Sequence, residues 1–76
     1  MTAAERVALE DAMIDEAAKI LERFKDSVPD GGHISLAMFS NGHIDAYICT
    51  GELNPATFVA YAWRSGETGE IYRGPI

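Results

Sequence analysis

The chain has little basic charge and a single cysteine. Six lysine and arginine residues stand against twelve aspartate and glutamate residues among 76, for a formal charge of −6. Nucleic-acid binding depends on Lys and Arg neutralising phosphates, so this balance argues against direct binding of nucleic acid and against an anionic membrane surface. Acidity of this size favours solubility, and it also favours attraction to a partner protein with a basic surface.

Cys49 stands alone, so an intramolecular disulfide is excluded and a reducing, cytoplasmic location is indicated. His33 and His43 lack metal-ligand spacing, and we expect neither a metal nor another cofactor. No apolar run approaches the roughly 20 residues of a membrane span, and the first residues do not resemble a signal peptide. A single domain of residues 1–76 without disulfide or metal is marginally stable, which leaves association as the remaining source of stability.

The strongest local pattern lies in residues 33–51, where two alternating runs flank Ser40, Asn41 and Gly42. A three-residue loop with Gly42 at positive φ pairs Phe39 with His43, whereas a two-residue loop would mix apolar and polar faces. The favoured register places six side chains on one face of a hairpin: Ile34, Leu36, Met38, Ile44, Ala46 and Ile48. The other face then carries Ser35, Ala37, Phe39, His43, Asp45 and Tyr47.

The first 24 residues predict a long amphipathic helix. Thr2 and Glu5 form a capping box, and Pro29 with the following glycines ends the segment. Asp15 and Lys19 have the spacing of a favourable ion pair. The apolar stripe consists of Val7, Met13, Ile14, Ala17, Ile20, Leu21 and Phe24. At about 1.5 Å per residue this helix is roughly 36 Å long, so it extends beyond strands of about 23 Å.

Residues 56–64 are ambiguous between strand and helix. Asn54 and Pro55 suit a helix start, but the short, apolar run rich in aromatic residues favours a strand. Residues 69–73 predict a further strand. The predicted fold is therefore α+β, α-β-β-β-β, with the helix packed on an antiparallel four-stranded meander. The alternative is α-β-β-α-β with residues 55–64 helical.

This fold predicts a core and leaves an apolar surplus. We expect a buried face of Ile34, Leu36, Ile44 and Ile48 against Ile14, Ala17, Leu21 and Phe24. The third strand is apolar on both sides, with Phe58, Ala60 and Ala62 opposite Val59, Tyr61 and Trp63. One set therefore joins Phe39 and Tyr47 toward solvent, unless the tail of residues 73–76 covers it, and exposed apolar patches mark interfaces. The predicted protein-binding residues are Val7, Asp11, Asp15, Phe39, Tyr47, Tyr61 and Trp63.

Catalytic patterns are weak. Cys49 with His33 or His43 lacks an orienting residue and an oxyanion-hole motif, so a half-exposed cysteine without a catalytic role is the better interpretation. His43 beside Asp45 is typical of a solvated hairpin face. The glycines match neither a dinucleotide fingerprint nor a P-loop. The acidic helix face could imitate a phosphate backbone, but interspersed Lys and Arg favour an ordinary solvated face.

The function favoured by these patterns is non-enzymatic binding of another protein. Size, acidity, the absence of catalytic motifs and a spare apolar face give the chain a general resemblance to small phage-encoded inhibitors, anti-CRISPR proteins among them. The resemblance is one of style and implies an inhibitor of a host system. The alternative is a structural or assembly subunit that acts by self-association. We expect a homodimer, with Val7, Tyr61 and Trp63 as its main contributors.

Overall fold

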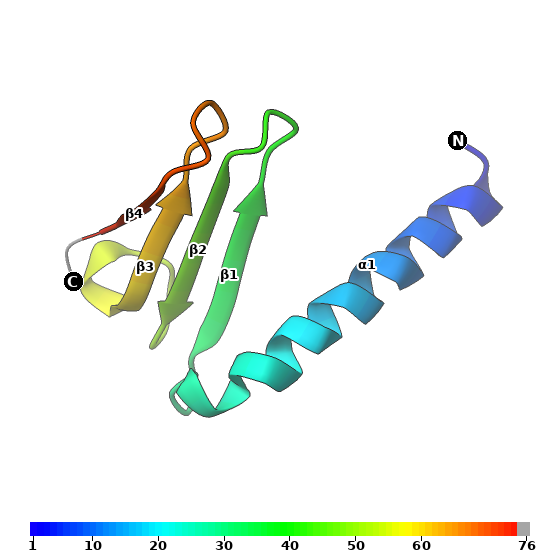
Figure 1. The fold of residues 1–76 in the computed structure, drawn as a ribbon. Helices are drawn as coiled ribbons and strands as arrows, with labels where there is room; N and C mark the ends of the chain where they lie inside the picture. Colours follow the sequence, from blue (N-terminus) through cyan, green and yellow to red (C-terminus); the bar gives the residue numbers. More distant parts are fainter. Residues whose placement is uncertain (75–76) are drawn as a thin grey trace.

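The computed structural model describes residues 1–74 as one long helix followed by a four-stranded antiparallel sheet (Figure 1). The helix α1 spans Ala3–Phe24 and continues into a 3-10 turn, η1, at Lys25–Ser27. The strands are β1 (His33–Met38), β2 (Ile44–Cys49), β3 (Phe58–Arg64) and β4 (Ile71–Arg73), with a second 3-10 turn, η2, at Pro55–Thr57. Their order in the sheet is β1-β2-β3-β4, which confirms the predicted α-β-β-β-β meander.

Local side-chain bonds begin and support α1. The Thr2 hydroxyl accepts a hydrogen bond from the Glu5 amide at 3.1 Å, and the Glu5 carboxylate accepts one from the Thr2 amide at 3.1 Å, which confirms the capping box. The hydrogen bond from the Thr2 amide to the carboxylate, together with the nearby Thr2 hydroxyl, holds the pKa of the Glu5 carboxyl below its usual value. Lys19 pairs with Glu16 at 2.9 Å, so the expected pair with Asp15 was wrong; the i,i+3 neighbour takes the ammonium group instead.

The hairpin of β1 and β2 has the predicted register. Ile34 pairs with Ile48, Leu36 with Ala46 and Met38 with Ile44, so these side chains share one face. The Phe39 amide donates to the His43 carbonyl at 2.9 Å, and Gly42 has a φ of 92°. This positive φ favours glycine, and it closes the three-residue loop that keeps the two faces separate.

Residues 58–64 form the strand β3, so the helical alternative for residues 55–64 was wrong. Asn54 does cap a turn, since its side-chain oxygen accepts from the Ala56 amide at 3.0 Å, but only η2 follows before the chain extends. A bulge between Ile48 and Cys49 aligns Cys49 with Phe58 and leaves Val59 as the extra residue. Phe58 therefore lies on the face of Tyr61 and Trp63, which corrects its predicted grouping with Ala60 and Ala62.

The helix does not lie in close contact with the sheet. Figure 1 shows α1 leaving the start of β1 and diverging from it toward the N-terminus. Every α1 residue except Ile20 is exposed, and Cys49 is the one fully buried residue among residues 1–74. The predicted buried core was therefore wrong for a single chain: none of the eight residues assigned to it is buried, and on the helix side Ile14 is 69% exposed, Leu21 55% and Phe24 45%.

The connection from α1 to β1 explains this arrangement. Gly31 has a φ of 75°, and a Cβ on Gly32 would collide with the carbonyl oxygen of Cys49. The turn thus lies directly against the end of β2, where it contributes to the complete burial of Cys49. The apolar pattern identifies which faces need cover, but this glycine turn sets the direction in which the helix leaves the sheet.

Candidate functional site

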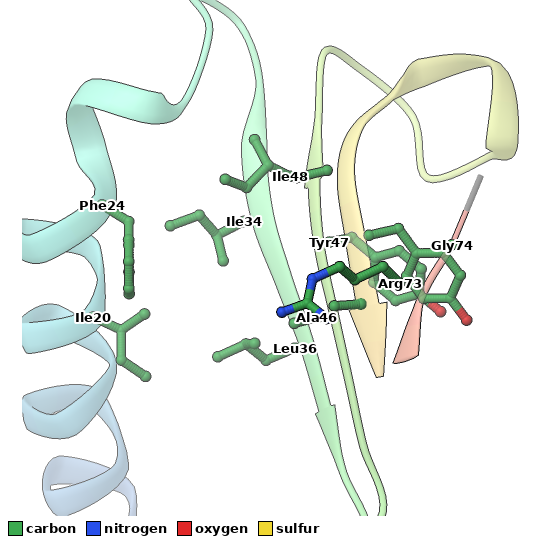
Figure 2. Close-up of a pocket in the computed structure, with 12 residues that line it drawn as sticks. Ile20, Phe24, Ile34, Leu36, Ala46, Tyr47, Ile48, Arg73 and Gly74 are labelled. Atoms are coloured by element: carbon green, nitrogen blue, oxygen red, sulfur yellow. The ribbon is translucent and has the colours of Figure 1, made fainter. Parts of the chain in front are cut away.

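An open apolar groove separates α1 from the sheet (Figure 2). In Figure 2, Ile20 and Phe24 point from α1 toward Ile34, Leu36 and Ile48 on the sheet. This hollow has a volume of about 420 Å³, and an adjoining hollow of about 620 Å³ continues along α1. We call the two hollows together the apolar groove, because both are lined by Ile20, Ile34 and Leu36.

The groove offers apolar contact and little polar chemistry. Its second hollow is lined on the helix side by Ile14, Ala17, Ala18 and Leu21. Among residues 1–74, the charged or titratable side chains at its walls are Arg73 beside the first hollow and His33 beside the second, because Tyr47 and Tyr61 carry their rings on the other face of the sheet. An exposed apolar surface of this kind is suited to contact with apolar groups.

The opposite face of the sheet carries a row of stacked rings. Tyr47 and Tyr61 stack with centroids 4.5 Å apart and planes 5° from parallel, Tyr61 lies 5.2 Å from Trp63, and Trp63 lies 5.5 Å from Tyr72. We call these rings and Phe58, which lies 4.9 Å from Tyr47, the aromatic ladder. Each stacked pair contributes about 0.5–1.5 kcal/mol beyond its buried area. The rings cover one another and much of this face.

The aromatic ladder also changes one titration. Partial burial raises the pKa of the Tyr47 hydroxyl above its ordinary value, and the nearby Tyr61 hydroxyl and Asp45 carboxylate raise it further. Asp45 in turn lies 3.1 Å from the ring nitrogen Nε2 of His43. These groups form a polar margin beside the ladder.

The predicted protein-binding residues fall into two separate regions. Tyr47, Tyr61 and Trp63 meet in the aromatic ladder, where they are half-buried. Phe39 lies near the hairpin loop, is 55% exposed and contacts the His43 ring edge-on.

Val7, Asp11 and Asp15 form the second region, on the part of α1 that diverges from the sheet (Figure 1). Val7 is 51% exposed, and the two carboxylates are also exposed. The structure therefore does not join them to the aromatic residues in one surface.

Sequence reasoning missed the groove itself. The residues that line it had been identified by their alternation and helical spacing, but they were assigned to a closed core. The apolar periodicity therefore identified the side chains that line the groove. The direction of α1 in the structure shows that these side chains face an open groove.

Cys49 and the histidines do not form an accessible reactive centre. Cys49 is 0% exposed, so the expectation of a half-exposed thiol was wrong. His33 is its partner in the register of β1 and β2, as predicted, but the side chain of His33 is exposed. Residues 1–74 contain no group of three or more side chains that could hold a metal ion.

Comparison of the chain with protein-family models, with curated proteins and with solved structures found no match. Within the part of the chain that the structure describes, no helix has the length and apolarity needed to cross a membrane. The function must therefore be inferred from the surfaces of the chain itself.

Proposed function

We propose that this chain is a non-enzymatic interaction protein that acts by binding another protein in the apolar groove. The observation that carries the proposal is the groove, where a helix face and a sheet face of one small chain both stand uncovered. Contiguous apolar surface of this kind usually marks a protein interface. Small domains of 76 residues also depend on association more than larger ones do.

The chemistry of the chain supports a particular kind of partner. With a formal charge of −6, the chain as a whole attracts a protein with a basic surface and repels phosphate backbones. Exposed Asp11 and Asp15 on α1 add to this attraction. An inhibitor that docks on a basic site of a host system, in the style of small phage proteins, combines these features.

The buried thiol supports a binding role rather than a catalytic one. Cys49 is inaccessible to a substrate in the folded chain, and the lining of the groove has no nucleophile with an adjacent base. A single cysteine, unable to form an intramolecular disulfide, fits the reducing environment of a cytoplasmic protein.

A second candidate function is assembly through self-association. The observation that favours it is that the helix face and the sheet face of the groove are both apolar and belong to the same chain. The helix face of one copy can therefore pack on the sheet face of another copy. A homodimer is the simplest closed assembly of this kind.

Affinity capture from the native host with matched variants tests the proposed function. Leu36→Glu places a carboxylate in the groove, whereas Leu53→Glu makes the same change at a loop leucine that is 53% exposed and does not line the groove. We expect one host protein to be captured by the native chain and by Leu53→Glu, and lost with Leu36→Glu while circular dichroism shows an intact fold. Equal capture by Leu36→Glu, or no specific capture by the native chain, would contradict the proposal.

A further inference from the structure

We infer that the apolar groove is filled by α1 of a second copy of this chain. The inference rests on the second candidate function, assembly through self-association, because it names a second copy as the protein that occupies the groove. In the resulting two-fold dimer, the two α1 helices lie side by side between the two sheets. Each helix then contacts the sheet of its partner on one edge and the helix of its partner on the other.

The exposed area of the single chain is the first argument. A folded monomer of 8.3 kDa exposes about 4,600 Å², whereas this chain exposes 5952 Å², roughly 1,400 Å² more. Its radius of gyration is 14.5 Å, against about 11 Å for a compact chain of this length. Obligate dimers bury about 1,000–2,500 Å² per partner, so the excess has the size that one such interface removes.

The apolar arc of α1 is the second argument. At about 100° per residue, the apolar positions between Met13 and Phe24 span roughly 160° of the helix surface with no charged residue among them. A helix that covers one sheet needs an arc of only about 100°. Ile20 lies at one edge of the arc and faces its own sheet, while Ile14 and Ala18 lie at the other edge. With the groove filled, the first edge contacts the partner helix, and the second edge is available to the partner's sheet.

The length of α1 explains why a second copy suits the groove better than closure of the helix on its own sheet. The 22 residues of α1 extend about 33 Å, whereas the six residues of β1 extend about 20 Å. A closed chain would therefore leave the first turns of α1 uncovered, with Val7 among them. Two antiparallel helices between two sheets cover both halves of each helix.

Charge does not oppose this arrangement as strongly as the formal charge suggests. Arg6 pairs with Glu10, Lys19 with Glu16, and Lys25 with Glu22, so much of the helix charge is compensated within each chain. The unpaired carboxylates Asp11 and Asp15 lie outside the apolar arc and remain toward solvent.

Light scattering coupled to size exclusion, with two matched variants, measures the assembly. Ile14→Glu adds a carboxylate to the apolar arc, and Ala12→Glu adds one to the opposite side of the same helix. At tens of micromolar we expect twice 8.3 kDa for the native chain and for Ala12→Glu, and 8.3 kDa for Ile14→Glu. A native mass of 8.3 kDa across this range would overturn the dimer.

Isotope-filtered NMR on a mixture of methyl-labelled and unlabelled native chains then locates the contact without any substitution. We expect inter-chain NOEs from Ile14 and Leu21 methyl groups to Leu36 methyl groups. A dimer whose inter-chain NOEs lie only along β1 or the aromatic ladder would overturn helix exchange. A monomer that still captures a host protein through the groove overturns the dimer alone, whereas a monomer that captures nothing overturns the proposed function as well.

Discussion

Ile14→Ala distinguishes a covered groove from an open one, because Ile14 is 69% exposed in a single chain. Each buried methyl or methylene group contributes about 0.8 kcal/mol, so removing a side chain that is only about one third covered costs about 0.8 kcal/mol in all. The better helix propensity of alanine offsets about 0.4 kcal/mol of this loss. A chain that remains alone should therefore lose less than about 0.5 kcal/mol of stability.

A dimer gives a different magnitude for the same substitution. With Ile14 enclosed between two helices and a sheet, truncation to alanine costs about 2–5 kcal/mol at each of two sites per dimer. Urea denaturation followed by far-ultraviolet circular dichroism, at two protein concentrations tenfold apart, measures this cost. The native midpoint should rise with concentration. A loss below about 0.5 kcal/mol together with a midpoint independent of concentration would refute the reasoning.

Three other substitutions test separate parts of the structure. Cys49→Ser should lower the unfolding midpoint, because a hydroxyl in this fully buried position loses its hydrogen bonds to water at a cost of about 1–3 kcal/mol. Partner binding by the folded variant should persist. Loss of binding with the fold intact would favour a reactive thiol. Because the pKa of Tyr47 is raised in the native chain, the unfolded chain, with its ordinary value of 10.0, releases this proton first, and the free energy of unfolding falls above pH 10.0. Tyr47→Phe should reduce this fall. An equal fall in the variant would assign it to another group. Thr2→Ala should reduce helicity at neutral pH, a cap being worth about 0.5–2 kcal/mol. Because the pKa of Glu5 is lowered, its share of the cap is present above the ordinary value of 4.5 and lost as pH falls through the lowered value. This bond goes to the Thr2 backbone amide and persists in the variant, so both chains should lose helicity in acid, and a native helicity that does not fall would contradict the capping box.

Much of the sheet could be predicted from sequence because its signals are local. The alternation around Gly42 fixed both the loop length and the faces of β1 and β2, since a shift of one residue would have mixed apolar and polar side chains. The aromatic and β-branched residues of β3 favoured a strand over a short helix. The capping box likewise located the start of α1 to the residue.

The remaining features depend on contacts that a local pattern does not contain. The bulge beside Cys49 adds Val59 to one strand without changing the apolar character of the run, so the face of Phe58 could not be read from alternation alone. The turn at Gly32 lies against the carbonyl oxygen of Cys49, a contact between segments that are distant in sequence. The groove depends on the direction in which α1 leaves that turn. The apolar arc of α1 indicates only that this side of the helix contacts another apolar surface.

The most direct test of a covered groove is amide hydrogen exchange along α1 in the native chain. Helices in proteins gain most of their stability from tertiary packing, so an uncovered α1 should exchange rapidly even though it is capped. With the groove filled by a second α1, the amides between Met13 and Phe24 should exchange as slowly as those of β2, and this protection should be lost in Ile14→Glu but retained in Ala12→Glu. Rapid exchange throughout α1 beside a protected β2, at concentrations where the dimer is expected, would contradict the account.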